Sequence, residues 1–471
     1  MKRLRLSSNH EMLCLDANTR LADSSSATPV LKIVCPSLVR LDADMKFQPA
    51  LAASWTIEDD YRVFTFKLQE NAYFHSGRPV TAEAVAWNYN RLFDSRVGSL
   101  LAVDYAGVES IRAISKDTVE FRYPEPFPAL LYQLSGRTHI ADDSQTQPVG
   151  AGPFQVTDWV RGSHLTMKRF DKYYEPGLPL ADEIVVTWAP DSAYRLDLIE
   201  RGEVDIVESV PAKAADDLRK RGLLESASTA SPRKLSFAFN CGIPPFDDVR
   251  MRQAVAHAVD REAVVETFFG SYAHVFDAAY AAGSQWAPDL DPISVDLEKA
   301  RSLVKEAGYA DGVTIRTVTT NVAPIPRVAQ AVAADLAQIG ITLDIRGYDD
   351  PPWWPLIYLD TDWQAAFQGM GPRAHPDILF RREFMTDGTF NPVNYSNPDL
   401  DALIMRARVA VDEAEQARLY REAQVILRED LPYLPLYATD ALVGWRPVVE
   451  GFGPHPLGYW DVTGVSASDW S

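Results

Sequence analysis

A polar loop, Gly136-Arg137-Thr138-His139, contains residue types that could bind a small charged molecule. It follows an apolar stretch, and no carboxylate lies next to Arg137 in the sequence. A guanidinium group matches the planar geometry of a carboxylate, so Arg137 could bind an acidic ligand. It could equally pair with a distant Asp or Glu. The loop therefore gives two candidate ligand contacts, Arg137 and His139.

A second polar loop extends from Gly369 to Asp377. Asp is a favoured helix cap, so Asp377 could simply begin a helix over Ile378-Leu379-Phe380. Two tryptophans follow a pair of prolines earlier in the chain, and such rings either cover a ligand or pack beneath their loop. The further candidates for ligand contact are Trp353, Trp354, Met370, Arg373, His375 and Asp377.

Motifs of enzymes and of metal or phosphate sites are missing from the sequence. We find no G-x-S-x-G elbow, HExxH, complete GxGxxG or Walker loop. None of the eight histidines has the i, i+4 spacing of a helical metal pair. In Gly150-Ala151-Gly152-Pro153, the proline removes a backbone donor that a phosphate would need, so we expect a turn. The prediction is a protein without catalytic residues, metal or cofactor.

Composition narrows the possible partners. The chain has 46 Lys and Arg against 65 Asp and Glu, which gives a net charge of −19. An acidic chain repels the phosphates of nucleic acids and anionic lipids, so neither is an expected partner. The three cysteines are too few and too scattered for a disulfide framework.

The cellular location is left open between two alternatives. No run of about 18 apolar residues exists, so no membrane-spanning helix is predicted. The start, MKRLRLSSNH, lacks the apolar core of a signal peptide. Either the protein is cytoplasmic or Met1 replaces a removed leader, although Leu4 to Ser7 already resembles the first strand of a domain.

The chain of 471 residues is too long for one core, and strand and helix patterns alternate along it. Helix caps are expected at Thr81, at Asp191 or Ser192, and at Asp247, Asp260 and Asp296. Val313–Thr319, Pro326–Ile339 and Ile341–Arg346 read as a strand, helix and strand with a parallel pair. Residues 397–428 read as helical, and Leu436–Val443 reads as a strand that returns the chain to the first domain.

A hairpin near the start carries the most specific pattern. In LAASWTIEDDYRVFTFKLQENAYFHSGRP, residues 51–79, two strands join at Asp59-Asp60, and Phe64, Phe66 and Leu68 form a buried face. With GAGPFQVTDW, DSAYRLDLIERGEVDI, PFDDVRMRQAVAHAVDREAVV and the segment Leu297–Asp344, it resembles the family 5 extracellular solute-binding proteins. These proteins serve ABC importers of dipeptides, oligopeptides, nickel chelates and opines. The matching segments occur in the family's order along nearly the whole chain.

The resemblance implies an α/β fold, namely a two-lobed periplasmic-binding-protein fold (type II, cluster C) with an extra inserted subdomain. Lobe I would comprise residues 1–30, 148–239 and 433–471, with the subdomain at 31–147. Lobe II would comprise residues 240–432, with chain crossings near Asn240 and Tyr437. A ligand would be held between the lobes by hinge closure.

The resemblance also assigns roles to the candidate residues. In nickel-chelate members an Arg corresponding to Arg137 grips a carboxylate, and an aromatic residue often replaces Met370. In peptide-binding members an Asp in the second loop pairs with the amino terminus of the ligand. Asp377 keeps that Pro-Asp step, whereas His375 replaces a residue that is commonly acidic.

The resulting hypothesis is a periplasmic, monomeric substrate-binding component that delivers a small peptide or carboxylate-bearing solute to membrane permease subunits. Two alternatives stay open: a nickel-chelate or opine-binding protein of the same family, and a cytoplasmic ligand sensor with the same fold. No helix-turn-helix or basic patch accompanies the sensor reading.

Overall fold

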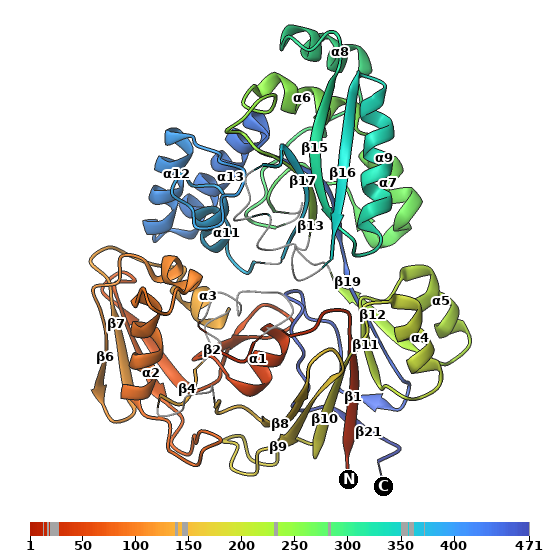
Figure 1. Cartoon of the computed structure of the whole chain (residues 1–471). Coiled ribbons are helices and arrows are strands. Elements are labelled where there is room, and N and C mark those ends of the chain that lie inside the picture. Colours follow the sequence, from red (N-terminus) through yellow and green to blue (C-terminus); the bar gives the residue numbers. More distant parts are fainter. Residues whose placement is uncertain are drawn as a thin grey trace. The chain divides into compact units, whose positions relative to one another are not determined.

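The computed structural model describes residues 1–470, except 13, 17, 19–27, 137–139, 144–148, 230–233, 281–283, 350–356, 358–361 and 372. The chain forms two compact units (Figure 1). Unit 1 comprises Met1–Ala230 and Ala441–Ser471, and unit 2 comprises Ser231–Asp440.

Unit 1 contains a seven-stranded sheet in the order β12-β19-β11-β1-β10-β9-β8. The strands β1 (Arg3–Ser8), β10 (Glu183–Trp188) and β11 (Ile206–Glu208) are parallel, and the remaining pairs are antiparallel. The other members are β8 (Phe154–Val160), β9 (His164–Arg169), β12 (Glu225–Thr229) and β19 (Ala441–Trp445). Helices α1 (Thr28–Val34), α4 (Ser192–Glu200) and α5 (Ala212–Lys220) complete this part, with two short strands, β20 (Val449–Glu450) and β21 (Ser466–Ala467).

The predicted hairpin forms a second sheet of unit 1. Strands β4 (Ala52–Glu58) and β5 (Val63–Leu68) pair antiparallel, and the turn between them has positive φ at Asp59, Asp60 and Tyr61. β7 (Thr118–Arg122) and β6 (Ser110–Ser115) extend the sheet. Phe64, Phe66 and Leu68 are buried against α2 (Ala82–Asn90) and α3 (Leu130–Ser135), as predicted. Short elements here are β2 (Val39–Leu41), β3 (Phe47–Pro49), η2 (Arg91–Phe93) and η3 (Leu100–Tyr105).

Unit 2 is built on a six-stranded sheet in the order β14-β18-β13-β17-β15-β16. Its strands are β13 (Lys234–Phe239), β14 (Ala273–His274), β15 (Val313–Thr320), β16 (Ile341–Tyr348), β17 (Ala365–Met370) and β18 (Tyr433–Thr439). β15 is parallel to β16 and to β17, so the predicted strand, helix and strand unit is confirmed with α9 (Ile325–Ala337) as its helix.

Helices cover both faces of this sheet (Figure 1). Phe237, Phe239 and Phe367 pack in one core with α9, α6 (Val249–Ala258), α7 (Arg261–Phe268) and α8 (Leu297–Glu306). The alternate residues Ala238 and Ala366 pack in a second core with α11 (Pro376–Glu383), α12 (Pro398–Val409) and α13 (Glu413–Asp430). Because successive strand residues face opposite sides, both faces of the sheet are apolar and buried. A short turn, η4 (Gly270–Tyr272), precedes β14.

Several sequence expectations differ from the structure. The cap of α6 is Asp248 rather than Asp247, and residues 397–428 form two helices interrupted at Ala410–Asp412. The expected strand Leu436–Val443 is two strands in different sheets, β18 and β19. The crossings expected near Asn240 and Tyr437 therefore differ from the observed division, because β13 and β18 both hydrogen-bond within the unit 2 sheet.

Candidate functional site

Parallel strands place the candidate loops of unit 2 at one edge of its sheet. β15, β16 and β17 run in the same direction and end at Thr320, Tyr348 and Met370. In open α/β sheets, ligands bind outside the carboxyl ends of such strands. β13 runs the opposite way and begins at this edge, where Lys234 pairs with Met370. The chain after β17 leads directly into the loop that contains Arg373, His375 and Asp377.

His375 is the N-cap of α11. Its Nδ1 accepts a hydrogen bond from the Asp377 backbone N–H at 3.2 Å, and Nε2 contacts Gln416 Oε1 at 3.2 Å. The ring lies edge-on to Trp286, with centroids 4.8 Å apart. Burial lowers the pKa of His375 to about 4, so the ring is neutral near pH 7. The sequence alternative in which Asp377 caps this helix is therefore wrong: His375 is the cap.

Asp377 lies in the first turn of α11 and is fully buried. Its Oδ2 accepts from Arg408 Nη1 of α12 at 2.9 Å, and its Oδ1 accepts from the Tyr420 hydroxyl of α13 at 3.4 Å. Burial and the neighbouring Asp377 charge raise the pKa of Tyr420. Asp377 thus joins three helices within unit 2, and contact with a ligand stays a prediction.

Arg373 and Glu383 form a second buried pair. Arg373 Nη2 lies 3.5 Å from Glu383 Oε1, and their side chains are only 10% and 6% exposed. Lys234 Nζ donates to the Ala279 carbonyl at 2.9 Å. Burial lowers the pKa of Lys234 to about 8, while Glu383 raises it and Arg373 lowers it further. Two cations and one carboxylate therefore interact at the edge where β17 ends and β13 begins.

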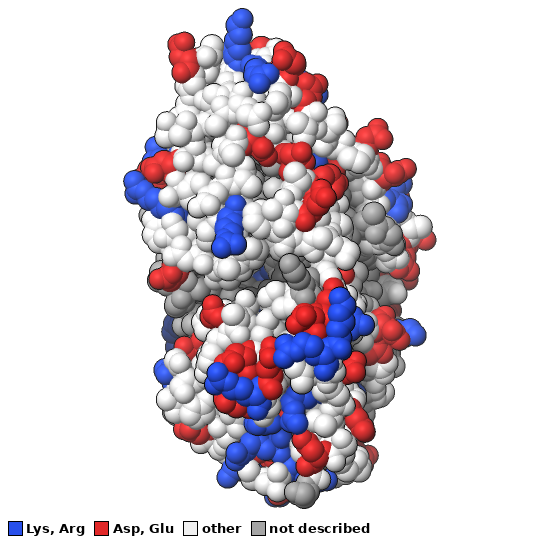
Figure 2. Space-filling view, turned by 90° about the vertical axis from the view of Figure 1, so that its right-hand side faces the viewer, with Lys and Arg blue, Asp and Glu red and all other residues white. Residues whose placement is uncertain are grey.

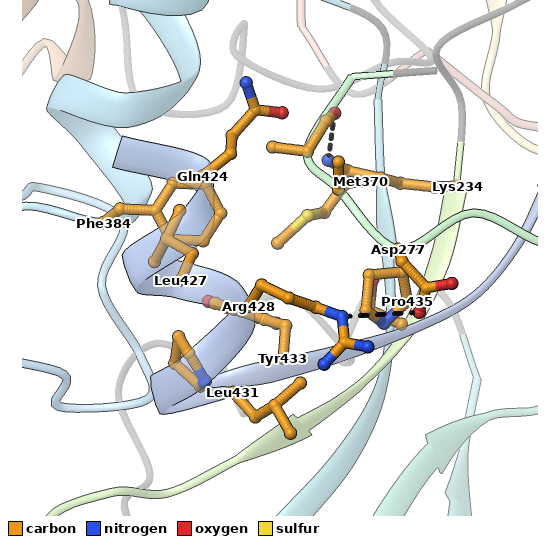
Figure 3. Close-up of a pocket in the computed structure, with 14 residues that line it drawn as sticks. Lys234, Asp277, Met370, Phe384, Gln424, Leu427, Arg428, Leu431, Tyr433 and Pro435 are labelled. Carbon is orange, nitrogen blue, oxygen red and sulfur yellow. Dashed lines mark hydrogen bonds and ion pairs between the residues drawn. The ribbon is translucent and has the colours of Figure 1, made fainter. Parts of the chain in front are cut away.

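A cavity adjoins this cluster (Figure 3). Its volume of about 30 Å³ holds roughly two waters and is far below the several hundred Å³ of a typical ligand pocket. Asp277 in its wall pairs with Arg261 at 2.8 Å and lies 3.8 Å from Arg428. The lining includes Lys234, Asp277, Met370, Phe384, Gln424 and Arg428. The cavity is too small for a peptide, and it shows that Met370 faces the interior of unit 2.

The predicted site residues divide into two groups. Met370, Arg373, His375 and Asp377 come together at and below one edge of the unit 2 sheet. Arg137, His139, Trp353 and Trp354 lie outside the described residues. Sequence reasoning missed Lys234 and Glu383; the signal for Lys234 was a lysine that opens the mainly apolar strand KLSFAF. Glu383 gave no such signal, because only the folded chain brings it close to Arg373 and Lys234.

The described parts of the chain show neither a metal-binding cluster nor a membrane-spanning helix. They contain no group of three or more His, Cys, Asp or Glu side chains placed to hold a metal ion. No helix among them has the length and apolar character needed to cross a membrane. On the face shown in Figure 2, acidic and basic side chains are interspersed.

Comparisons with known proteins agree on one family. The family model described as bacterial extracellular solute-binding proteins, family 5 Middle, matches residues 46–391. The glutathione-binding protein GsiB of Escherichia coli K12 is 28% identical over 463 residues, which covers 93% of this chain and 88% of GsiB.

Solved structures extend the likeness to the fold. The periplasmic binding protein AgaA of A. tumefaciens R10, in complex with agropinic acid, has a TM-score of 0.90 at 26% identity, covering 100% of this chain and 99% of AgaA. DppA of Helicobacter pylori, in complex with the peptide STSA, has a TM-score of 0.90 at 22% identity, covering 99% and 98%. The predicted two-lobed α/β binding-protein fold is confirmed.

Proposed function

Because this chain belongs to the bacterial extracellular solute-binding proteins, family 5, we propose that it captures a small peptide or another carboxylate-bearing solute for an ABC importer. The observation that supports an acidic ligand is an excess of positive charge: two cations, Lys234 and Arg373, share one carboxylate, Glu383, at the carboxyl edge of the unit 2 strands. A carboxylate brought to this edge would gain charge-assisted hydrogen bonds in a poorly hydrated setting.

The relatives support this ligand class. GsiB is a glutathione-binding protein, and AgaA was solved with agropinic acid. Glutathione and agropinic acid are both acids. A free carboxylate is therefore the feature that we propose for the solute of this chain.

We propose further that loops of both units contact the solute and that the units close around it as hinged bodies. The protein would act outside the cytoplasm as a monomer, pass its solute to permease subunits, and release it chemically unchanged. Chromatography of glutathione after incubation with the protein tests the last point, since any product would contradict a purely binding role.

The first test of the proposed function is to identify the bound solute. Native mass spectrometry of protein purified from its source organism should show a bound acid. Calorimetry with glutathione, agropinic acid and the dipeptide Met-Leu then measures affinity. Absence of binding to these three compounds and of any co-purified solute would contradict the proposed function.

The variant Arg137→Ala tests the carboxylate contact that the sequence predicts. Loss of a hydrogen bond to a charged group costs about 1.5–3 kcal/mol, so affinity should fall roughly tenfold or more. Arg96→Ala is the matched control, because the Arg96 side chain is 89% exposed and pairs locally with Asp94. Equal affinity of Arg137→Ala and wild type would refute the contact while leaving the solute-binding function intact.

A further inference from the structure

Lys32 of α1 is an unusual cation in unit 1. Its Nζ donates to the carbonyl of Ser135, the last residue of α3, at 2.5 Å. It also lies 4.5 Å from the centroid of the Tyr459 ring. An ammonium group has three N–H donors, and one carbonyl and one ring face leave capacity for a further acceptor.

Desolvation of its positive charge makes the position of Lys32 energetically unfavourable. The residue keeps some exposed surface, but the protein atoms around its ammonium desolvate the charge and lower the pKa of Lys32 to about 7. Among the described side chains, no carboxylate offsets the effect of desolvation on the pKa of Lys32. A desolvated charge without a counter-charge costs several kcal/mol. A leucine or methionine would fill the same space without that cost.

Among the described residues, the titratable groups beside Lys32 include Tyr459 and His455. His455 stacks on Tyr459 with centroids 4.8 Å apart, and its Nε2 contacts the Leu41 carbonyl at 3.2 Å. Burial first, and then the positive charge of Lys32, lower the pKa of His455, whereas Asp461 raises it. His455 is therefore neutral near pH 7, and Tyr459 presents its ring face to Lys32.

Lys234 in unit 2 has closely similar surroundings. Its Nζ also donates to one backbone carbonyl, that of Ala279 at 2.9 Å, and lies 5.8 Å from the Phe276 ring centroid. Glu383 interacts electrostatically with Lys234, whereas Lys32 has no corresponding carboxylate among the described side chains. Ser135, the acceptor for Lys32, precedes by two residues the Arg137 that the sequence nominates for ligand contact.

We propose that Lys32 is a ligand-binding residue that takes an acidic group of the solute, which supplies the counter-charge that the described parts of unit 1 lack. This inference rests on the proposed solute-binding function and deepens it. It requires that the solute carry a carboxylate or comparable anion, which excludes neutral sugars and purely cationic solutes.

The test compares Lys32→Met with Lys172→Met by calorimetry, using glutathione or the co-purified acid as the probe. Lys172 is a matched control because it lies over a tyrosine ring of the same unit, Tyr73, at 5.5 Å, but is exposed. Lys32→Met should weaken binding at least tenfold and leave the melting temperature unchanged or higher, because it removes a desolvated charge. Lys172→Met should change neither quantity.

Proton uptake separates ligand contact from a packing role. Because the pKa of Lys32 is about 7, its amine is largely deprotonated at pH 8 in the ligand-free protein, and a bound anion would restore the proton. Calorimetry in two buffers of different ionisation enthalpy should therefore show uptake of up to one proton by wild type and none by Lys32→Met. Affinity of wild type should fall as pH rises above 7, by up to about tenfold per unit.

Two outcomes would overturn the inference without touching the solute-binding function. One is a bound solute that carries no acidic group. The other is wild-type affinity and wild-type proton uptake in Lys32→Met. Failure of wild type to bind any solute would instead refute the proposed function itself.

Discussion

Buried ion pairs fix individual side chains in unit 2. Arg408 and Asp377 meet at 2.9 Å with side chains 7% and 0% exposed. Desolvation makes such a pair a small net contributor, yet removal of one partner strands a buried charge. The pair therefore holds α11, α12 and α13 in a defined arrangement, since each contributes a residue through Asp377, Arg408 or Tyr420.

At the residue scale we predict that Asp377→Ala destabilises unit 2 by about 3–5 kcal/mol, because it removes a carboxylate that pairs with the buried Arg408 guanidinium. Urea denaturation measures this change. Asp344→Ala is the control: its pair with Arg346 is long, 3.8 Å, and exposed. That variant should cost less than about 1 kcal/mol.

A double variant separates stability from ligand contact at Asp377. Asp377→Leu with Arg408→Leu removes both charges and should recover at least half of the lost stability. If the recovered protein binds glutathione as tightly as wild type, Asp377 does not contact that solute. Equal stability of Asp377→Ala and wild type would show that the ion pair between Asp377 and Arg408 does not form in solution.

At the element scale, α1 is held by two glycines in addition to its buried apolar side chains. A Cβ at Gly150 would lie 1.7 Å from the Val34 carbonyl oxygen, and one at Gly152 would lie 2.0 Å from that of Ile33. Gly152 N–H donates to Val34 O at 3.0 Å. The segment that superficially resembles a phosphate loop is thus a backbone contact with the last turn of the helix that carries Lys32.

Gly152→Ala should therefore destabilise unit 1 by about 3 kcal/mol, because the added methyl meets backbone that cannot move aside. Thermal unfolding monitored by circular dichroism measures the effect. Gly453→Ala serves as the control, since a Cβ there meets nothing within 4 Å. A melting temperature of Gly152→Ala within a degree of wild type would contradict this account of how α1 is positioned.

At the scale of the whole molecule, the chain passes between its two units only twice, before β13 and after β18. Two such connections favour relative motion of the units. We predict that saturating glutathione, or the co-purified acid, decreases the radius of gyration measured by small-angle X-ray scattering. Arg137→Ala at the same solute concentration should show a smaller decrease. An unchanged radius on saturation of wild type would argue against hinge closure.

Local signals explain most of the fold that the sequence predicted. Caps at Thr81, Asp191, Asp260 and Asp296 lie where expected, because a side-chain acceptor needs only the next three residues to act. The short range of this interaction also explains why the predicted cap at Asp247 was wrong. Asp247 and Asp248 are adjacent and could both cap α6, and only the path of the backbone selects Asp248.

The sequence by itself determined the family, the alternation of strands and helices, and the loops where ligand contacts were sought. Tertiary structure decided which charges meet. Lys32 and Ser135 are 103 residues apart, and Lys234 and Ala279 are 45 apart. No local periodicity or spacing encodes such pairs. They exist because the fold brings distant backbone carbonyls to a buried ammonium, and that proximity is what turns an ordinary lysine into a candidate for binding an acid.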